Sequence, residues 1–509
     1  MTTNPTNTRA GRREWTALAV LMLPLLLVSM DVSVLYFAIP AIGADLEPTG
    51  TQQLWIFDIY AFVLAGLLMT MGSVGDRVGR RRLLLIGAAA FGAASLVAAY
   101  ANSAETLIAA RALLGIGGAT LMPSTLSLVR AMFTDAAQRA TAIAVWSGVL
   151  TAGVALGSVL SGVLVEFFWW GSVFLVNLPA MALLLLLGPL LLPESRDPHP
   201  GRFDWLSVPL SMAAVLPVVY GLKEIPSEGW NVRYVVSITV GLLFAVLFVH
   251  RQRTARSPMI SPTLFRAPGF TTAVGLNLVS AFGVLGSAYF TTQYLQSVLD
   301  KSALEAALWA LLPSVPIGLA APLAARLVGR GVNRAYVVAA GFAIAASGYG
   351  LLAFAGPDTM ALVLVACGVL ASGLVTAMSQ LMDLALSGVP VERAGSASSL
   401  METGAEFGGA LGMALLGSIG TAIYRNEIPA SSPDVARETL GGALAVADQV
   451  PGLAAAARAA FTSGMQGAAV AGATVLAGAA VLAAVSLRRV KVCTNETPDE
   501  PSHLSPSGV

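Results

Sequence analysis

The amino-acid sequence predicts an all-α membrane protein that crosses the bilayer about fourteen times, counted in apolar segments of about 20 residues. The first observation is composition: 56% of the 509 residues are hydrophobic and only 11% are charged, whereas about a quarter of a soluble protein is charged. The second is that the apolar residues form long uninterrupted runs. Because lipid offers the backbone no hydrogen bonds, such runs must be helical.

Connections between the predicted spans are short until the last, a stretch rich in Ser, Pro, Ala and acids that we expect to be a loop or a short surface helix. The first apolar run follows Arg12, Arg13 and Glu14 without a small-residue cleavage site, so we expect a retained helix and not a removed signal peptide. The predicted spans are 15–40, 52–72, 83–101, 104–129, 140–165, 171–192, 205–222, 232–249, 269–297, 304–325, 335–355, 359–384, 395–424 and 464–487.

The distribution of lysine and arginine predicts the orientation of these spans. With the N-terminus inside, most of the 29 basic residues fall in inner loops, few fall in outer loops, and Arg111 alone lies within a span. Cytoplasmic loops carry such an excess, so both termini are predicted to be cytoplasmic. One missed span would disturb the alternation, so the bias also supports the count.

Several function classes are excluded by composition and missing motifs. A net charge of +1 does not indicate nucleic-acid binding. Cys367 and Cys493 are too few for a disulfide framework or metal cluster, and His199, His250 and His503 have no ligand spacing. The sequence has no G-x-x-x-x-G-K-S/T loop, so ATP is not the expected energy source. We therefore expect neither an enzyme nor a cofactor.

The loop between the second and third predicted spans carries the ordered pattern G-x-x-x-D-R-x-G-R-R. Glycines permit a tight turn and close helix approach, while Asp76 can cap the next helix or pair with a cation. The pattern resembles the signature loop of the major facilitator superfamily. A looser copy between spans ten and eleven, which runs from Pro322 to Arg330, is typical of a duplicated half. The predicted gating residues are Gly72, Asp76, Arg77, Gly79 and Arg80.

Other segments resemble the fourteen-helix drug:proton antiporter branch of this superfamily, including its quaternary-ammonium exporters. Spans one, four and six carry Met30-Asp31, Arg111-Ala-Leu-Leu-Gly115 and Phe174-Leu-Val-Asn177. Span five resembles the antiporter signature G-x-x-x-G-P-x-x-G-G, although Ser158 and Ser161 depart from it. Small residues at this spacing equally suit helix packing. The matching glycines are Gly153, Gly157 and Gly162.

This resemblance implies a major facilitator fold of two six-helix halves plus two additional helices. It also implies a bacterial plasma-membrane protein that works as a monomer and exports bulky cationic or zwitterionic aromatics, such as dyes, quaternary ammonium compounds and fluoroquinolones, against the proton gradient. The expected domains are a cytoplasmic N-terminus 1–14, a first half 15–192, inserted helices with a flanking loop 193–250, a second half 251–487 with an extracellular loop 425–463, and a disordered cytoplasmic tail 488–509.

Ionisable residues inside predicted spans are the principal site candidates, because burying a charge in a membrane is costly. Asp31, Asp58 and Arg111 come from three spans at similar depth, about 10 to 13 Å from the outer surface. A purely structural ion pair is the alternative for Arg111. Glu402 and Glu406 share one helix face, about 12 and 18 Å from the inner surface. The alternative for these two acids is that this segment is a short helix at the inner mouth of the protein, where Glu402 contacts water.

A carboxyl group in a low-dielectric cavity can hold a proton near neutral pH, and without the proton it attracts a cation. One site could therefore exchange protons for cationic drugs. Aromatic side chains could hold a flat cation, and methionine could supply adaptable lining, although each candidate could equally serve packing. The candidate lining residues are Tyr36, Phe57, Tyr60, Trp146, Tyr289, Tyr294, Trp309 and Met378.

Three transport functions remain compatible with the sequence. The first is proton-coupled efflux of amphipathic cations. The second is a proton symporter or facilitator for a metabolite, although acids, and not the Asn, Gln and Trp clusters of sugar porters, dominate the polar residues of the spans. The third is a lipid or lipid-conjugate exporter. In each case the expected partners are small molecules, protons and the lipid bilayer.

Overall fold

The computed structural model describes residues 10–196, 204, 206–228, 230–255, 264–387, 389 and 394–488, whose regular secondary structure is helical throughout. Thirteen helices of this described part are long and apolar enough to cross a membrane. The predicted span 205–222 corresponds to α8 (Ser207–Glu228). The apolar part of α8, Ser207–Leu222, is shorter than these thirteen helices and is not counted among them. The all-α membrane fold is confirmed, while the count of fourteen stays a prediction.

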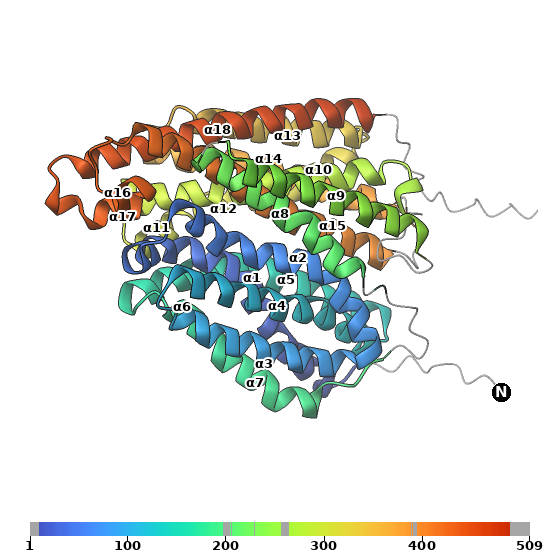
Figure 1. The fold of residues 1–509 in the computed structure, drawn as a ribbon. Helices are drawn as coiled ribbons and strands as arrows, with labels where there is room; N and C mark the ends of the chain where they lie inside the picture. The colour runs from blue at the N-terminus through green and yellow to red at the C-terminus, as the bar shows by residue number, and fades with distance from the viewer. Residues whose placement is uncertain are drawn as a thin grey trace, which may run out of the picture.

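The first bundle is formed by the helices up to α7, and the second by those from α10 onward (Figure 1). The first bundle contains α1 (Arg12–Leu46), α2 (Gly50–Val78), α3 (Arg80–Ala99), α4 (Ala104–Met132), α5 (Ala136–Phe167), α6 (Ser172–Leu175) and α7 (Asn177–Leu191). The second contains α10 (Phe270–Gln293), α11 (Ala303–Trp309), α12 (Ser314–Gly329), α13 (Arg334–Leu352), α14 (Met360–Ser387), α15 (Ala394–Glu427) and α18 (Leu453–Ser486).

The two bundles meet mainly through α2 against α15, α5 against α11 and α1 against α10. Small residues allow the closest approaches within and between them. At Gly408 and Gly412 of α15, a Cβ atom would lie only 2.1 Å from the carbonyl oxygens of Leu278 and Phe282 in α10. These glycines therefore set both the distance between α10 and α15 and the rotation of α15 about its own axis.

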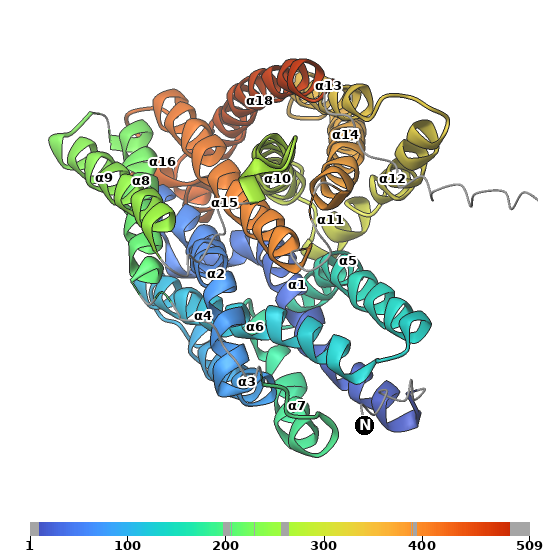
Figure 2. The same cartoon turned by 90° about the vertical axis from the view of Figure 1, so that its right-hand side faces the viewer.

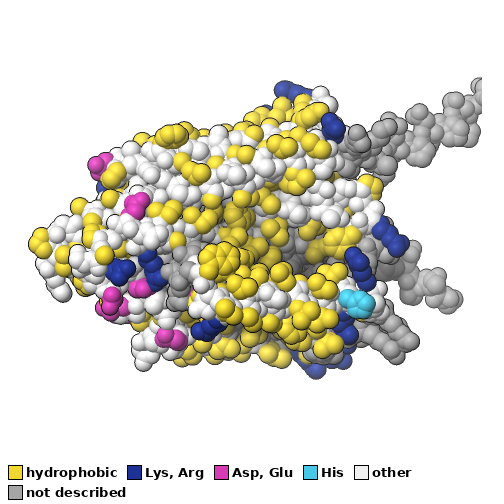
Figure 3. Space-filling view, turned by 45° about the horizontal axis from the view of Figure 1, so that its top comes forward, with side chains coloured by type: hydrophobic (Ala, Val, Ile, Leu, Met, Phe, Trp, Pro, Cys, Tyr) yellow, Lys and Arg dark blue, Asp and Glu magenta, His cyan; other side chains and the backbone are white. Residues whose placement is uncertain are grey.

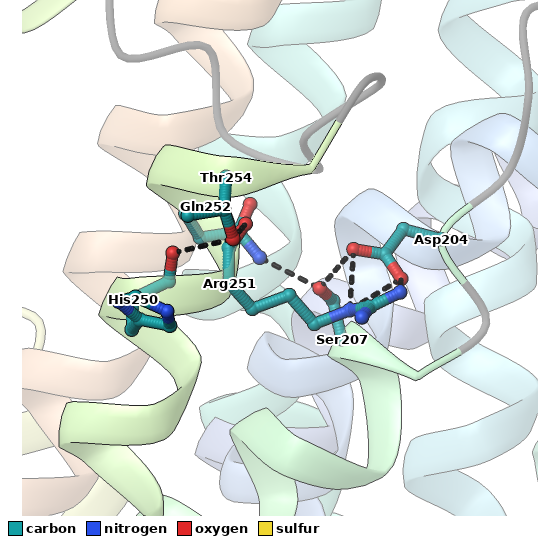
Figure 4. A network of polar contacts seen from close by, with 6 residues as sticks. All are labelled: Asp204, Ser207, His250, Arg251, Gln252 and Thr254. Carbon is teal, nitrogen blue, oxygen red and sulfur yellow. Dashed lines mark hydrogen bonds and ion pairs between the residues drawn. The ribbon is translucent and has the colours of Figure 1, made fainter.

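A helical pair, α8 and α9 (Val232–Thr254), packs beside the junction of the bundles, where α8 contacts both α2 and α15 (Figure 2). A polar network joins its two ends on one side (Figure 4). The Arg251 Nε donates to the Asp204 carboxylate at 2.8 Å, and the Gln252 amide donates to the Ser207 hydroxyl at 2.7 Å. Burial raises the pKa of Asp204, but hydrogen bonds from Arg251 and Ser207 outweigh burial and hold that pKa below its ordinary value.

The long connection before the last helix is shorter than the predicted 425–463, because α15 continues to Glu427 and α18 begins at Leu453. It contains two short helices, α16 (Asp434–Glu438) and α17 (Leu440–Ala445). The Tyr424 hydroxyl at the end of α15 donates to the Ala436 carbonyl at 2.7 Å, which holds this connection against the bundle.

On the face shown in Figure 3, charged side chains gather at the two ends of the molecule and hydrophobic side chains cover the middle. On this face one end carries lysine and arginine without acids, while aspartate and glutamate lie at the opposite end together with some basic side chains. This distribution agrees with the predicted orientation. The cytoplasmic location of both termini stays a prediction, and the predicted tail 488–509 lies almost entirely outside the described residues.

Candidate functional site

The centre of the first bundle is organised around Arg111, whose exposed fraction is 1%. Its guanidinium forms an ion pair with Asp31 of α1, and its Nε donates to the Ile56 carbonyl of α2 at 3.0 Å. The guanidinium carbon also lies 4.5 Å from the ring centroid of Tyr60. Arg111 thus connects α4 to α1 and α2, and the ion pair, the hydrogen bond and the cation–π contact together offset the cost of its burial.

The antiporter-motif helix α5 packs against α1 on either side of Asp31. A Cβ atom at Gly153 or Gly157 would lie 1.8 or 2.3 Å from serine hydroxyl oxygens of α1 and about 3 Å from its backbone, so these glycines allow the two helices to approach closely. Gly162 faces the other bundle, where its Cβ would lie 2.9 Å from a carbonyl of α11. Ser161, one of the two departures from the family pattern, donates to the Val34 carbonyl of α1 at 2.7 Å.

Three of the predicted aromatic residues form one cluster across the bundle junction. The ring centroids of Tyr36 and Phe57 are 5.0 Å apart, and those of Phe57 and Tyr289 are 5.6 Å apart. The Gln53 amide of α2 donates to the Tyr289 hydroxyl of α10 at 3.1 Å. Because Gln53 is near the first residue of α2 and Tyr289 near the last of α10, these contacts join the bundles toward their predicted outer ends.

Glu402 and Glu406 lie one helical turn apart on α15 and are partly exposed. No hydrogen bond or ion pair joins either carboxylate to a described residue. One face of α15, which carries Gly408 and Gly412, contacts α10, and another face, which carries Ala410, packs toward α2. Each residue advances about 100° around a helix, so both acids lie between these two faces. They therefore point toward the space between α2 and α10.

The two sets of acids lie near each other, although they belong to different bundles. Helix α15, which carries both glutamates, packs against α2, which carries Asp58 and Tyr60. Asp58 is buried, and Arg111, the partner of Asp31, lies over the Tyr60 ring. The structure therefore brings the predicted acids, Arg111 and the aromatic cluster into one central region.

Four other predicted lining residues do not join this aromatic cluster. The Trp146 indole donates to the Thr125 hydroxyl within the first bundle at 3.2 Å. The Tyr294 hydroxyl donates to the Gly356 carbonyl at 2.6 Å within the second bundle. Trp309, at the end of α11, is 39% exposed, and Met378 of α14 is partly buried. The contacts of Trp146 and Tyr294 are those of packing residues.

The predicted gating loop is hydrogen-bonded to the segment that follows α7. Gly79 separates α2 from α3 with a φ of 109°, and Asp76 forms an ion pair with Arg80. The Arg80 amide donates to the Ser195 carbonyl at 2.9 Å, and the Arg81 amide donates to the Glu194 carboxylate at 3.2 Å. Gly72 and Arg77 lie in the last two turns of α2 and are partly buried.

Glu194 is an interaction partner that motif reasoning missed, because it lies more than a hundred residues from the loop in sequence. Its carboxylate also lies within 4.0 Å of Arg81 and Arg82. A Cβ atom at Gly79 would lie 2.5 Å from that carboxylate, so the motif glycine also makes room for it. The only signal in the sequence is an acid that directly follows the sixth apolar run.

Residues 21–413 match the family model described as Major Facilitator Superfamily. The chain belongs to this superfamily. It is 44% identical to the multidrug efflux pump LfrA of Mycolicibacterium smegmatis, over 95% of this chain and 98% of that protein. It is 33% identical to the methyl viologen resistance protein SmvA of Salmonella typhimurium, over 86% of this chain and 90% of that protein. It is therefore a multi-pass membrane protein of a transporter superfamily, which is not an enzyme class.

Solved structures of the superfamily share the fold. A bacterial homologue of the human lysosomal transporter Spinster, in an inward-facing unoccupied conformation, gives a TM-score of 0.66 at 20% identity, over 94% of this chain and 98% of that one. A peptide transporter POT gives a TM-score of 0.59 at 16% identity, over 93% and 96%. The arrangement of helices in this chain is thus that of the superfamily.

Proposed function

We propose that this chain is a proton-coupled antiporter that exports amphipathic cationic or zwitterionic aromatic compounds. The observation that carries the proposal is the pair of partly exposed carboxylates, Glu402 and Glu406, which have no hydrogen-bond or ion-pair partner among the described residues. An acid kept in a membrane helix without a partner is a strong candidate for transport. The relatives LfrA, a multidrug efflux pump, and SmvA, a methyl viologen resistance protein, support the same proposal, since methyl viologen is an aromatic dication.

The exchange follows from the two states of a carboxyl group. With its proton bound, the group is neutral; when the proton leaves, the carboxylate attracts a cation. A drug that enters from the cytoplasm displaces a proton to the inside, and a proton from outside later displaces the drug. Tyr36 and Phe57, on the facing helices, offer aromatic faces to a flat cation. No cofactor is needed, and one chain supplies the whole site, so we propose a functional monomer.

The contacts between bundles support a conformation that is shut toward the outside. The Tyr36 hydroxyl donates to the Leu285 carbonyl at 3.4 Å, and the Gly50 amide donates to the Glu438 carboxylate at 3.2 Å. Gly50 is the first residue of α2 and Glu438 lies between α15 and α18, so this contact is at the predicted outer surface. Release of the drug outward requires these contacts to break, which is the alternating-access step.

The decisive experiment measures ethidium and fluoroquinolone accumulation in cells with and without the protein, before and after the proton gradient is collapsed. We expect lower accumulation with the protein, and loss of this difference when the gradient collapses. Glu402→Gln and Glu406→Gln should each raise accumulation toward the level of cells that lack the protein. Accumulation that rises with wild-type protein would instead indicate import, and export that persists without the gradient would contradict proton coupling.

Proton exchange itself can be measured on purified protein. Tetraphenylphosphonium added in weakly buffered solution should release protons from the wild type and release fewer from Glu402→Gln or Glu406→Gln. Asp76→Asn is the matched control, because Asp76 lies in the gating loop and pairs with Arg80 away from the acids. Equal proton release from the wild type and both glutamine variants would place the coupling proton elsewhere.

A further inference from the structure

An apolar cavity of about 200 Å³ lies where the inserted helices meet both bundles. Its lining includes Phe62 of α2, Met212 of α8, Phe248 of α9, Val274 of α10 and Phe407 of α15. None of the described residues that line it is charged. Neither bundle alone encloses this space, because α8 and α9 form one of its walls.

The cavity lies in the half of the membrane next to the predicted cytoplasmic side. Met212 is five residues from the start of α8, or about 8 Å along the axis, and Phe248 is six residues from the end of α9, or about 9 Å. Toward the outside, Ala61 of α2 and Ala410 of α15 are buried in one hydrophobic cluster. The cavity therefore lies at the predicted level of the inner leaflet, on the cytoplasmic side of that cluster.

The cavity adjoins the acids of the central site through α15. Thr403 lines the cavity, and its neighbour Glu402 lies about 100° further around the helix. The Thr403 hydroxyl is buried and has no hydrogen-bond partner among the described residues. The side of α15 that faces the apolar cavity therefore carries the Thr403 hydroxyl, and the adjacent side of the same helix carries the Glu402 carboxylate.

A flexible side chain closes the space between α2 and α8. The Met212 methyl group lies so near Gly66 that a Cβ atom there would be 1.7 Å from it. Methionine adapts its shape easily, because its side chain is unbranched. The outer face of α9 is lipid-accessible, since Val246 on that helix is 66% exposed. Among the described residues, α8 and α9 form the wall of the cavity on this lipid-accessible side.

We propose that this cavity binds the apolar part of an amphipathic cation that arrives from the inner leaflet, while the charged group of that cation pairs with Glu402. The inference rests on the proposed function. The size fits, because an apolar cavity of about 150 Å³ accommodates benzene. The charge also favours this occupant over a phospholipid, since Glu402 and Glu406 repel a phosphate group and attract an ammonium group.

The test compares export of dodecyltrimethylammonium, which has a long apolar tail, with export of methyl viologen, which has none. Ala65 is buried and lines the cavity, so Ala65→Leu fills it, whereas Met212→Ala enlarges it. We expect the ratio of the two export rates to fall at least fivefold in Ala65→Leu. In Met212→Ala the preferred tail should become longer, as measured with hexadecyltrimethylammonium. Val246→Phe, on the exposed side of α9, is the control and should leave the ratio unchanged.

A binding measurement keeps the inference testable if Ala65→Leu does not fold. A dodecyltrimethylammonium analogue with a photoreactive group at its tail end, added to wild-type protein in nanodiscs, should label peptides of α8 and α9 next to the cavity. Labelling should fall in Met212→Ala for this tail length. An unchanged ratio in both cavity variants, or labelling confined to α1 and α10, would overturn the inference. A wild type that exports neither compound would overturn the proposed function instead, and the labelling would still decide the inference.

Discussion

The two groups of ionisable residues in the membrane helices of this protein differ in what surrounds them. In the first bundle, Asp31 is paired with Arg111, which also binds a backbone carbonyl and an aromatic ring. In the second, Glu402 and Glu406 have no ion-pair partner among the described residues and remain partly exposed. A paired charge connects helices, whereas an unpaired acid can exchange a proton for a cation. The difference supports the proposal that the first group mainly holds helices together and that the second mainly exchanges protons for cations.

The assignment has an energetic basis. A buried ion pair contributes little net stability, but removal of one partner leaves an uncompensated charge. The two glutamates have no ion-pair partner among the described residues, so their replacement by glutamine leaves no uncompensated charge. Substitutions in the first bundle should therefore change folding and transport together, and substitutions of the glutamates should change transport alone.

The largest effect is expected for Arg111→Met, which leaves Asp31 without its partner and removes the link between α4 and α2. Loss of one member of a buried pair costs about 3 to 5 kcal/mol. Thermal unfolding of the purified variant should therefore occur at a much lower temperature than that of the wild type, with little protein in the membrane. The double variant Asp31→Leu with Arg111→Met should recover much of this stability. If the double variant also recovered drug export, Asp31 would have no role in exchange.

The next prediction separates stability from transport. Glu406→Gln should abolish export and change the unfolding temperature little, because the amide replaces a carboxyl group without leaving a charge behind. Asp31→Asn should lower both, since it leaves Arg111 with an unpaired charge. Parallel measurements of unfolding temperature and ethidium export would check this contrast. Equal destabilisation by both substitutions would show that the glutamates also hold the fold together.

Gly408→Leu tests whether the glycine face of α15 positions its acids. A side chain at Gly408 meets the Leu278 carbonyl of α10, so the helices must separate at a cost of about 1 to 3 kcal/mol. We expect reduced export and a lower unfolding temperature. Gly478→Leu is the matched control, because no atom lies within 4 Å of the position its Cβ would take. Similar losses in both variants would argue against a positioning role.

Ser161→Gly introduces the residue of the family pattern and removes the hydrogen bond to the Val34 carbonyl. A hydrogen bond of this kind contributes about 1 kcal/mol. We expect a small decrease in unfolding temperature without a change in the proton dependence of export. The control is Ser158→Gly, whose hydroxyl bonds only within its own helix. A loss of proton coupling in Ser161→Gly alone would give the antiporter motif a direct role.

The smallest effect is expected for the ion pair of the inserted helices. Asp204→Asn should cost less than about 1 kcal/mol, because Arg251 is more than a third exposed and water screens the pair. The pKa of Asp204 is lowered in the folded protein, so its contribution is present above about pH 4, the ordinary aspartate value, and is lost as pH falls below that range. Unfolding temperatures of wild type and variant should therefore converge in acid. A constant difference across pH would contradict this.

Much of the fold could be predicted from the chain because hydropathy and charge act locally. A run of about 20 apolar residues needs no distant partner to be recognised as a span. The arginine-rich loops likewise lead to an orientation, which stays a prediction. Asp31, Arg111, Glu402 and Glu406 could be selected one by one for the same reason, since a charge in an apolar helix is unusual wherever it faces. The family pattern located Gly79 and Gly157 in the same way.

What the tertiary structure decided is which of these residues meet. The pairing of Asp31 with Arg111, the position of Glu194 beside the gating loop and the separation of Trp146 from the Tyr36 cluster depend on how each helix is rotated and packed. The rotation of each helix about its axis is set by contacts such as that of Gly408 with α10, which join segments more than a hundred residues apart in the sequence. Hydropathy alone determined that the chain enters the membrane, because that depends on composition over one helix; the site required the packing of many helices, because its side chains come from both bundles.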